Sequence, residues 1–326
     1  MSFASPAAEP ARDSLALARD VAEGLAQEPK RVPSRYLYDA LGSRLFEAIC
    51  ELPWYTITRG ESALLAREAR AILSGLGPAH TVIELGAGSG KKLSLLLEHG
   101  DMTASTHVHV VDISPTALTL SKRTLRRHLH AEVVTHQATY QEGLATALGQ
   151  TERDRPAMVI FLGSNVGNMA RVDSDRFLRE IRGGCRPGDR FLLGADLVKP
   201  ETEMRLAYDD PLGVTAAFNK NLLIRLNREL DGDFDVEAFD HHVTWNDESS
   251  RIESYLVSRV EQLVCLREAG CCIRLVEGES IWTESSHKYT VDAIVEMGLA
   301  AGFSFRQQWI ETDSRFALTL FDCPAA

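Results

Sequence analysis

The chain has 326 residues, a net charge of −11 and a pI near 5.4, and 44% of its residues are hydrophobic. This acidic balance argues against nucleic acid or an anionic membrane as the main partner, and no apolar run is long enough to span a bilayer. The length and composition predict a globular protein with one large domain or two.

The six cysteines form no C-x-x-C pair and no Cys/His spacing typical of a metal site. Cys271 and Cys272 are adjacent, which is poor geometry for a structural disulfide. We therefore expect reduced thiols, a cytoplasmic location and no bound metal. Residues 1–12 lack the basic-then-apolar pattern of a signal peptide, and we expect them to form a disordered lead.

The first part of the chain reads as helices around an aromatic loop. Helical periodicity covers residues 13–25 and 36–49, and a further helix is expected over residues 61–76. Residues 52–61 form a loop rich in aromatic and hydroxyl groups. Such a loop suits either plain packing or a lid over a polar ligand.

A glycine-rich turn follows the apolar run at residues 82–85. Gly86, Gly88 and Gly90 break that run, and a helix begins near Lys91. Strand, glycine turn and helix form the unit that cradles phosphates or nucleosides in doubly wound folds. The spacing departs from the full dinucleotide fingerprint and suits a ligand without a pyrophosphate. The alternative is a purely structural glycine turn.

Strands and helices then alternate through the middle of the chain. Strands are predicted at residues 107–111, 131–136, 157–162 and 191–194, with helices at 115–128, 141–148 and 173–185. This alternation predicts a parallel, doubly wound α/β sheet. Ligands of such sheets bind beyond the carboxyl ends of the strands, where Asp112, Asn168 and Asp196 are expected.

The pattern changes after residue 199. Helices are expected at residues 202–208 and 216–230, followed by strands at 242–245, 252–258 and 271–276 and a polar segment at 278–288. This is an α+β insertion. The α/β pattern returns with a helix at 290–301 and strands at 303–310 and 316–321. We expect one domain from residues 61–198 and 287–326, and a second from 13–60 and 199–286.

Three polar residues beside the predicted sheet each have two interpretations. Asp112, about twenty residues past the glycine turn, suits either the ribose hydroxyls of a nucleoside or the N-cap of the next helix. Lys92 suits either a ligand carboxylate or a solvated surface position. Asn168 suits either a substrate carboxylate or amine, or ordinary turn chemistry.

Glu284 and Ser286 lie two residues apart in the polar segment. In an extended chain their side chains point the same way, and a carboxylate beside a hydroxyl suits the two nitrogens of an imidazole. The alternative is a polar surface loop.

Seven sequence blocks in one order resemble the histidine-specific family of S-adenosylmethionine (SAM)-dependent methyltransferases. They are P-x-x-Y-x-Y-D-x-x-G-S-x-L-F (33–46), L-P-x-Y-x-x-T-R-x-E (52–61), E-L-G-x-G-x-x-x-K (84–92), F-L-G-S-x-x-G-N (161–168), L-L-G-x-D-L-V-K (192–199), A-Y-D-D-x-x-G-V-T-A-A-F-N-x-N (207–221) and T-E-x-S-x-K (283–288). The blocks extend over most of the chain.

The resemblance implies a class I methyltransferase Rossmann-like domain that binds SAM, with a second α+β domain for the substrate. The implied reaction is Nα-methylation of L-histidine to its trimethylated form, hercynine, in ergothioneine biosynthesis. We expect the chain to be a monomer. The implied SAM contacts are Tyr38, Gly86, Lys92, Asp112, Thr139 and Tyr140. The implied substrate contacts are Tyr55, Asn168, Tyr208, Ser254, Glu284 and Ser286.

Methyl transfer from a sulfonium needs an aligned neutral amine, and we expect the hydroxyls of Tyr38 and Tyr55 to assist without a strong general base. Two positions depart from the family pattern. Thr139-Tyr140 stands where relatives carry Asp-Phe, and Ser254 stands where an apolar residue lines the imidazole pocket. These departures keep open another amino acid or a histidine derivative as substrate, or a non-catalytic SAM-binding protein.

Overall fold

The computed structural model describes residues 9–76, 80–99, 106–128, 132–152 and 155–325, which divide into two compact units. The insertion unit contains the chain up to Tyr55 together with Glu201–Ser285. The sheet unit contains Thr56–Pro200 and Ser286–Ala326. Each unit therefore combines segments that are far apart in the sequence.

The sheet unit is built on a seven-stranded sheet with the order β12-β13-β6-β5-β2-β3-β4. The five strands from β6 to β4 run parallel, whereas β13 pairs antiparallel with β6 and with β12. The strands are β2 (Thr81–Leu85), β3 (His107–Asp112), β4 (Glu132–Gln137), β5 (Ala157–Phe161), β6 (Arg190–Asp196), β12 (Ser304–Glu311) and β13 (Phe316–Asp322). The predicted parallel, doubly wound sheet is confirmed.

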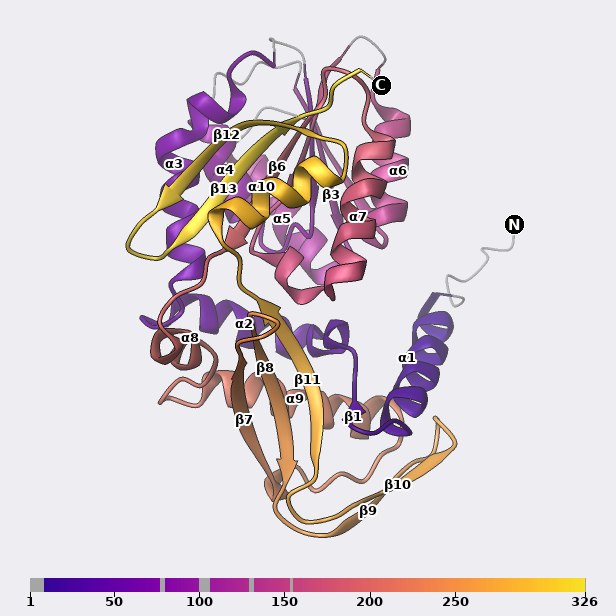
Figure 1. Cartoon of the computed structure of the whole chain (residues 1–326). Helices are drawn as coiled ribbons and strands as arrows, with labels where there is room; N and C mark the ends of the chain where they lie inside the picture. The colour runs from indigo at the N-terminus through magenta and orange to yellow at the C-terminus, as the bar shows by residue number, and fades with distance from the viewer. Residues whose placement is uncertain (1–8, 77–79, 100–105, 129–131, 153–154, 326) are drawn as a thin grey trace, which may run out of the picture. The chain divides into compact units, whose positions relative to one another are not determined.

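Helices cover both faces of this sheet (Figure 1). Helices α3, α4 and α5 pack in sequence on one face, and α6, α7 and α10 on the other. Their bounds are α3 (Ile57–Leu73), α4 (Lys91–Glu98), α5 (Pro115–His128), α6 (Tyr140–Gln150), α7 (Arg171–Gly184) and α10 (Val291–Ala300). Strands β2 and β5 are buried along their whole length, as expected for central parallel strands covered on both faces.

The insertion unit contains a four-stranded sheet with the order β1-β11-β8-β7 and a separate pair, β9 and β10. Helix α9 packs against α2 and against β7 and β8. The strands are β1 (Lys30–Arg31), β7 (Phe239–Asn246), β8 (Arg251–Ser258), β9 (Gln262–Leu266), β10 (Cys271–Leu275) and β11 (Ser280–His287), the last of which continues into the sheet unit. The helices are α1 (Glu9–Leu25), η1 (Ser34–Leu37), α2 (Ala40–Glu51), α8 (Glu201–Tyr208), α9 (Val214–Glu229) and η3 (Val236–Ala238).

Three helices begin at other residues than the sequence predicts. Helix α1 begins at Glu9, inside the segment expected to be disordered, and residues 1–8 of that segment lie outside the described residues. Helix α2 begins only at Ala40, because the Asp39 carboxylate accepts the Gly42 N–H at 2.7 Å and caps it. Helix α3 begins at Ile57, so the aromatic loop is shorter than expected and Glu61 lies within the helix.

The polar segment at residues 278–288 contains a strand, so the alternative of a surface loop is wrong. Strand β11 lies beside β8 and pairs in parallel with β1. Thr283 is fully buried, and its hydroxyl oxygen lies 2.5 Å from Asn219 Oδ1 and 3.1 Å from the Ser254 carbonyl oxygen. Hydrogen bonds therefore satisfy polar side chains inside this strand.

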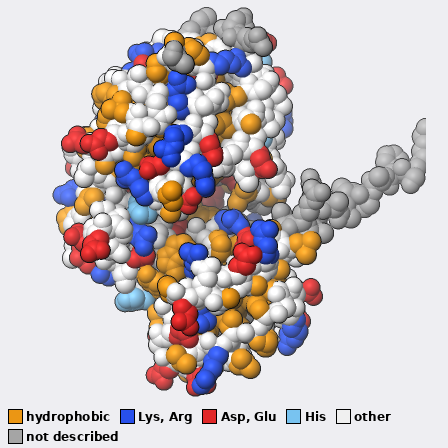
Figure 2. Space-filling view, turned by 45° about the vertical axis from the view of Figure 1, so that its right-hand side comes forward, with side chains coloured by type: hydrophobic (Ala, Val, Ile, Leu, Met, Phe, Trp, Pro, Cys, Tyr) orange, Lys and Arg blue, Asp and Glu red, His pale blue; other side chains and the backbone are white. Residues whose placement is uncertain are grey.

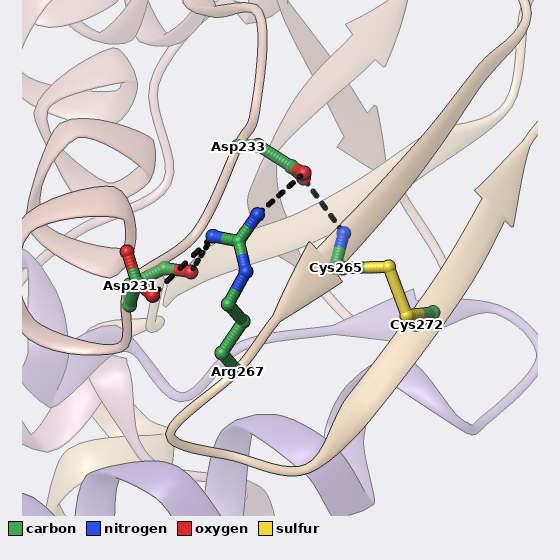
Figure 3. Close-up of a disulfide and its surroundings, with 5 residues drawn as sticks. All are labelled: Asp231, Asp233, Cys265, Arg267 and Cys272. Carbon is green, nitrogen blue, oxygen red and sulfur yellow. Dashed lines mark hydrogen bonds and ion pairs between the residues drawn. A yellow bond between two sulfur atoms is a disulfide. The ribbon is translucent and has the colours of Figure 1, made fainter.

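The expectation of reduced thiols is wrong for one pair of cysteines. Strand β9, which the sequence reading did not resolve as a separate strand, places Cys265 directly opposite Cys272 of β10. Their Cα atoms are 4.0 Å apart and their sulfurs form a disulfide. Figure 3 shows this disulfide and the neighbouring Asp233, which accepts the Cys265 N–H at 2.7 Å. The remaining cysteines, Cys50, Cys185, Cys271 and Cys323, are not disulfide-bonded.

Charged side chains of both signs are interspersed on the face shown in Figure 2, with hydrophobic side chains between them. None of the helices in the described ranges is long and apolar enough to cross a membrane.

Candidate functional site

The glycine turn between β2 and α4 has the backbone conformation that favours glycine. Gly86, Gly88 and Gly90 all have positive φ, at 77°, 49° and 73°. A Cβ on Gly86 would lie 3.0 Å from Asn165 Nδ2 and 3.2 Å from the Tyr140 hydroxyl oxygen. Polar side-chain atoms therefore lie close over the Gly86 backbone, beyond the carboxyl end of β2.

Asp112, at the end of β3, connects the glycine turn to the start of α5. One carboxylate oxygen accepts the Gly88 N–H at 3.1 Å and the other accepts the Ser114 N–H at 2.8 Å. Burial raises the pKa of the Asp112 carboxyl. The side chain therefore orders the local turn and is also fixed against the glycine backbone, as a ribose acceptor requires.

Lys92 is paired with a buried acid, which rules out the simple solvated surface position. Its Nζ lies 2.5 Å from Glu61 Oε2, and the Glu61 side chain is fully buried. Both Glu61 oxygens also accept the Gly163 N–H, at 2.8 and 2.9 Å. Sequence reasoning did not select Glu61 as a site residue, although it is the last residue of the L-P-x-Y-x-x-T-R-x-E block.

The turn after β5 is sharply bent and carries both asparagines of its sequence block. Gly163 and Ser164 have positive φ, at 75° and 56°, and the Ser164 hydroxyl oxygen accepts the Asp196 N–H at 3.0 Å. The 3-10 helix η2 (Asn165–Asn168) follows directly. Asn168 ends this helix, while Asn165, which sequence reasoning missed, carries the amide beside Gly86.

Thr139 and Tyr140 begin helix α6. The Thr139 hydroxyl accepts the Glu142 N–H at 3.4 Å and lies 2.8 Å from Glu142 Oε2, so Thr139 is one half of a capping box. The Tyr140 ring packs edge-on against Phe161, with centroids 5.2 Å apart, and burial raises the pKa of its hydroxyl. Tyr140 is therefore a neutral hydroxyl beside the glycine turn.

A buried charge cluster lies at the end of β6. The Asp196 carboxylate pairs with Lys199 and, at 2.8 Å, with Lys288. Lys288 also donates to Ser286 Oγ at 3.1 Å. Ser286, selected from the sequence for a ligand imidazole, is thus connected to the end of β6 through Lys288.

The aromatic residues predicted for the site cluster within the insertion unit. The Tyr55 and Tyr208 rings lie 6.1 Å apart, and the Phe46 ring lies 6.2 Å from Tyr55 and 5.5 Å from Tyr38. Burial raises the pKa of the Tyr55 hydroxyl well above its usual value, with Tyr208 as the next contribution. Tyr55 therefore remains protonated at neutral pH.

Ser254 and Glu284 belong to neighbouring strands of the same sheet, β8 and β11, and both are buried. The structure thus collects Tyr38, Tyr55, Tyr208, Ser254 and Glu284 in the insertion unit. It collects Gly86, Lys92, Asp112, Thr139, Tyr140, Asn168 and Ser286 in the sheet unit.

Residues 17–323 match the family model described as histidine-specific methyltransferase, SAM-dependent. The chain belongs to this family. It is 36% identical over 308 residues to a histidine N-alpha-methyltransferase of Mycobacterium tuberculosis, covering 94% of each chain. A protein of the same name from Mycolicibacterium smegmatis is 35% identical, with the same coverage. An ergothioneine biosynthesis protein 1 of Neurospora crassa is 26% identical, covering 86% of this chain and 32% of that protein.

Family membership identifies the sheet unit as the class I SAM methyltransferase core that the sequence predicted, and SAM as the methyl donor. The residues beyond the carboxyl ends of its strands fit this ligand. Asn165 and Tyr140 lie so close to Gly86 that a Cβ at this position would contact them. Glu84 Oε2 is a buried oxygen without a hydrogen-bond partner among the described residues. In the described ranges, no group of three or more His, Cys, Asp or Glu side chains could hold a metal ion.

Proposed function

We propose that the chain is a SAM-dependent Nα-methyltransferase that converts L-histidine to hercynine in ergothioneine biosynthesis. The observation that carries this proposal is the 36% identity, over 94% of both chains, to a histidine N-alpha-methyltransferase. A monomeric, cytoplasmic enzyme without a metal belongs to the same proposal.

The proposed SAM site occupies the glycine turn of the sheet unit. Asp112 would accept the ribose hydroxyls and Lys92 would neutralise the carboxylate of the methionine moiety. Tyr140 would stack on the adenine, beside Thr139. The contacts that support this placement are the Gly88–Asp112 hydrogen bond and the Glu61–Lys92 ion pair. We assign Tyr38 and Gly86 to the same ligand.

The proposed histidine contacts divide between the two ends of the substrate. Tyr55, Asn168 and Tyr208 would bind the amino and carboxylate groups. Glu284 and Ser286 would bind the imidazole ring, with Ser254 lining its pocket. The burial of Glu284 and Ser286, both less than a tenth exposed, supports a selective polar site over a solvated one.

The proposed reaction is an in-line displacement that the chain promotes by alignment. The lone pair of the neutral α-amine attacks the methyl carbon, the carbon–sulfur bond breaks, and S-adenosylhomocysteine leaves. The proton on nitrogen passes to water, and two further rounds complete the trimethylated product. Because burial raises the pKa of Tyr55, its hydroxyl would orient the amine as a hydrogen-bonding group rather than act as a tyrosinate base.

Mass spectrometry of the full chain incubated with SAM and each amino acid in turn tests this function. Histidine should gain one to three methyl groups, and the other amino acids none. If only another amino acid gains methyl groups, the substrate assignment is wrong. If SAM binds but no amino acid is methylated, the non-catalytic alternative holds.

The hydroxyl of Ser254 favours a second candidate substrate for the same N-methylation reaction. A hydroxyl where relatives carry an apolar residue suits a ring with an added polar group, such as a thiohistidine. Competition between histidine and such a derivative, measured as the ratio of kcat/KM values, decides between the two substrates.

A further inference from the structure

Lys288 is a buried lysine with a fixed set of partners near the end of β11. Its side chain has no solvent exposure, and its Nζ contacts Asp196 Oδ2 at 2.8 Å and Ser286 Oγ at 3.1 Å. The sequence comparison within the T-E-x-S-x-K block assigns roles to Glu284 and Ser286, and the proposed reaction does not use Lys288.

The carboxylate that holds Lys288 is itself immobilised. The backbone N–H of Asp196 donates to Ser164 Oγ at 3.0 Å, and its carbonyl accepts the Tyr289 N–H at 3.0 Å. Its second carboxylate oxygen pairs with Lys199. The backbone of Asp196 is therefore anchored at the end of β6, and its carboxylate contacts both Lys199 and Lys288.

An ammonium has three hydrogens to donate and no lone pair. Ser286 Oγ must therefore accept from Lys288, and the hydroxyl hydrogen of Ser286 is turned away from it. We propose that Lys288 is a positioning residue that presents Ser286 as a hydrogen-bond donor to a lone-pair nitrogen of the substrate ring. This inference rests on the proposed function, which assigns the ring to Glu284 and Ser286.

The consequence is a defined specificity. The Glu284 carboxylate accepts the N–H of one ring nitrogen, while Ser286 donates to the lone pair of the other. The pair selects a neutral imidazole in one tautomer. It discriminates against an imidazolium, which has no lone pair to accept, and against indole or phenyl rings, which have no acceptor nitrogen.

A double-mutant cycle on the full chain tests the inference, with Lys288→Met, Ser286→Ala and the combined variant. Lys199→Met is the matched control, because it removes the other lysine of the same Asp196 carboxylate and keeps the Lys288 hydrogen bond to Ser286. The measurements are KM for histidine, KM for SAM and kcat. Thermal unfolding and S-adenosylhomocysteine affinity report whether each variant is folded.

Each single variant should raise KM for histidine about tenfold, and the combined variant should raise it no further, since the two residues act through one hydrogen bond to the substrate. KM for SAM should stay within about twofold, and Lys199→Met should change KM for histidine by less than about threefold. If Lys288→Met does not fold, Lys288→Gln replaces it. Its amide N–H can still donate to Ser286, so KM for histidine should stay within about threefold of the wild type.

The inference is wrong if the increases in KM for histidine multiply in the double mutant. It is also wrong if Lys199→Met raises this KM as much as Lys288→Met does, or if Lys288→Gln raises it as much as Ser286→Ala does. These results leave the proposed function intact as long as the wild type methylates histidine. A wild type that methylates only a substrate without an imidazole overturns both the proposed function and the inference.

Discussion

Glu61 and Lys92 form an ion pair of 2.5 Å in which the acid is fully buried and the lysine remains partly exposed. The same carboxylate accepts the backbone N–H of Gly163, so a single side chain of α3 connects the turns that follow β2 and β5. The ammonium proposed to meet the SAM carboxylate is therefore held in place before the ligand arrives.

Glu61→Gln should weaken SAM binding, because the neutral amide can no longer hold the Lys92 ammonium. We expect KM for SAM to rise about tenfold and the free energy of unfolding to fall by about 2 kcal/mol. Steady-state kinetics and urea unfolding measure both quantities. Glu98→Gln is the control, since Glu98 is the last residue of α4 and accepts a hydrogen bond from the Ser94 hydroxyl. An unchanged KM for SAM in Glu61→Gln contradicts the positioning role.

Glu284→Ala should abolish most histidine turnover by removing the acceptor for a ring N–H. A lost hydrogen bond to a charged group predicts a fall of about 100-fold in kcat/KM for histidine. Calorimetry should find the affinity for S-adenosylhomocysteine unchanged. Glu279→Gln, at the turn before β11 where Glu279 pairs with Lys30, should retain turnover. Full activity in Glu284→Ala would refute the imidazole role.

Two stacked histidines of the sheet predict a loss of stability in acid. His109 Nδ1 and His136 Nε2 lie 2.9 Å apart, so one nitrogen donates and the other accepts through an unprotonated lone pair. Burial lowers the pKa of His109 to about 4. A pKa depressed in the folded state means that the unfolded chain takes up the proton first, so stability falls as the pH drops below about 6.5.

The expected loss between pH 6.5 and 4 is about 3 kcal/mol from His109. Urea unfolding across this range measures it, and His109→Leu should flatten the slope. The exposed His99 at the end of α4 provides the control, because His99→Asn should leave the slope unchanged. An equally steep slope in His109→Leu would assign the acid sensitivity to other groups.

The Cys265–Cys272 disulfide should stabilise the β9–β10 pair without affecting catalysis. It closes a short loop, with a sequence separation of 7, for which the chain-entropy relation gives about 2.5 kcal/mol. Cys272→Ser, or reduction of the wild type, should therefore lower the melting temperature while KM values stay constant. Non-reducing peptide mapping should find the two cysteines linked, and Cys50→Ser should melt like the wild type. A map without this linkage contradicts the disulfide.

The parallel sheet could be predicted from the sequence because short strands rich in apolar residues alternate with helices, and β5 is a continuous apolar run. Strands β2 and β5 are buried on both faces, and their hydrophobicity marks them without further information. Strand β11 has no such run of hydrophobic residues. Its buried interior contains Thr283, Glu284 and Ser286, so hydropathy suggests a loop where hydrogen bonding maintains a strand.

The sequence did not predict which side chains pair with one another across long stretches of the chain. Glu61 and Lys92 are 31 positions apart, and the Lys288 partner Asp196 is 92 positions away. A block match assigns a role to Lys92 and contains Lys288, but no local pattern identifies Glu61 as the partner of Lys92 or Asp196 as the partner of Lys288. The same limit applies to Cys265, whose partner depends on the register of β9 with β10.

The late position of β13 in the chain has a consequence for biosynthesis. Strand β6 ends at Asp196, but its antiparallel neighbour β13 begins only at Phe316. While the ribosome synthesises the intervening residues, the β6 edge of the parallel sheet lacks its strand partner and exposes unpaired backbone groups. Truncation before β13 should therefore yield an aggregating product, and the final strand acts as the step that completes a soluble sheet.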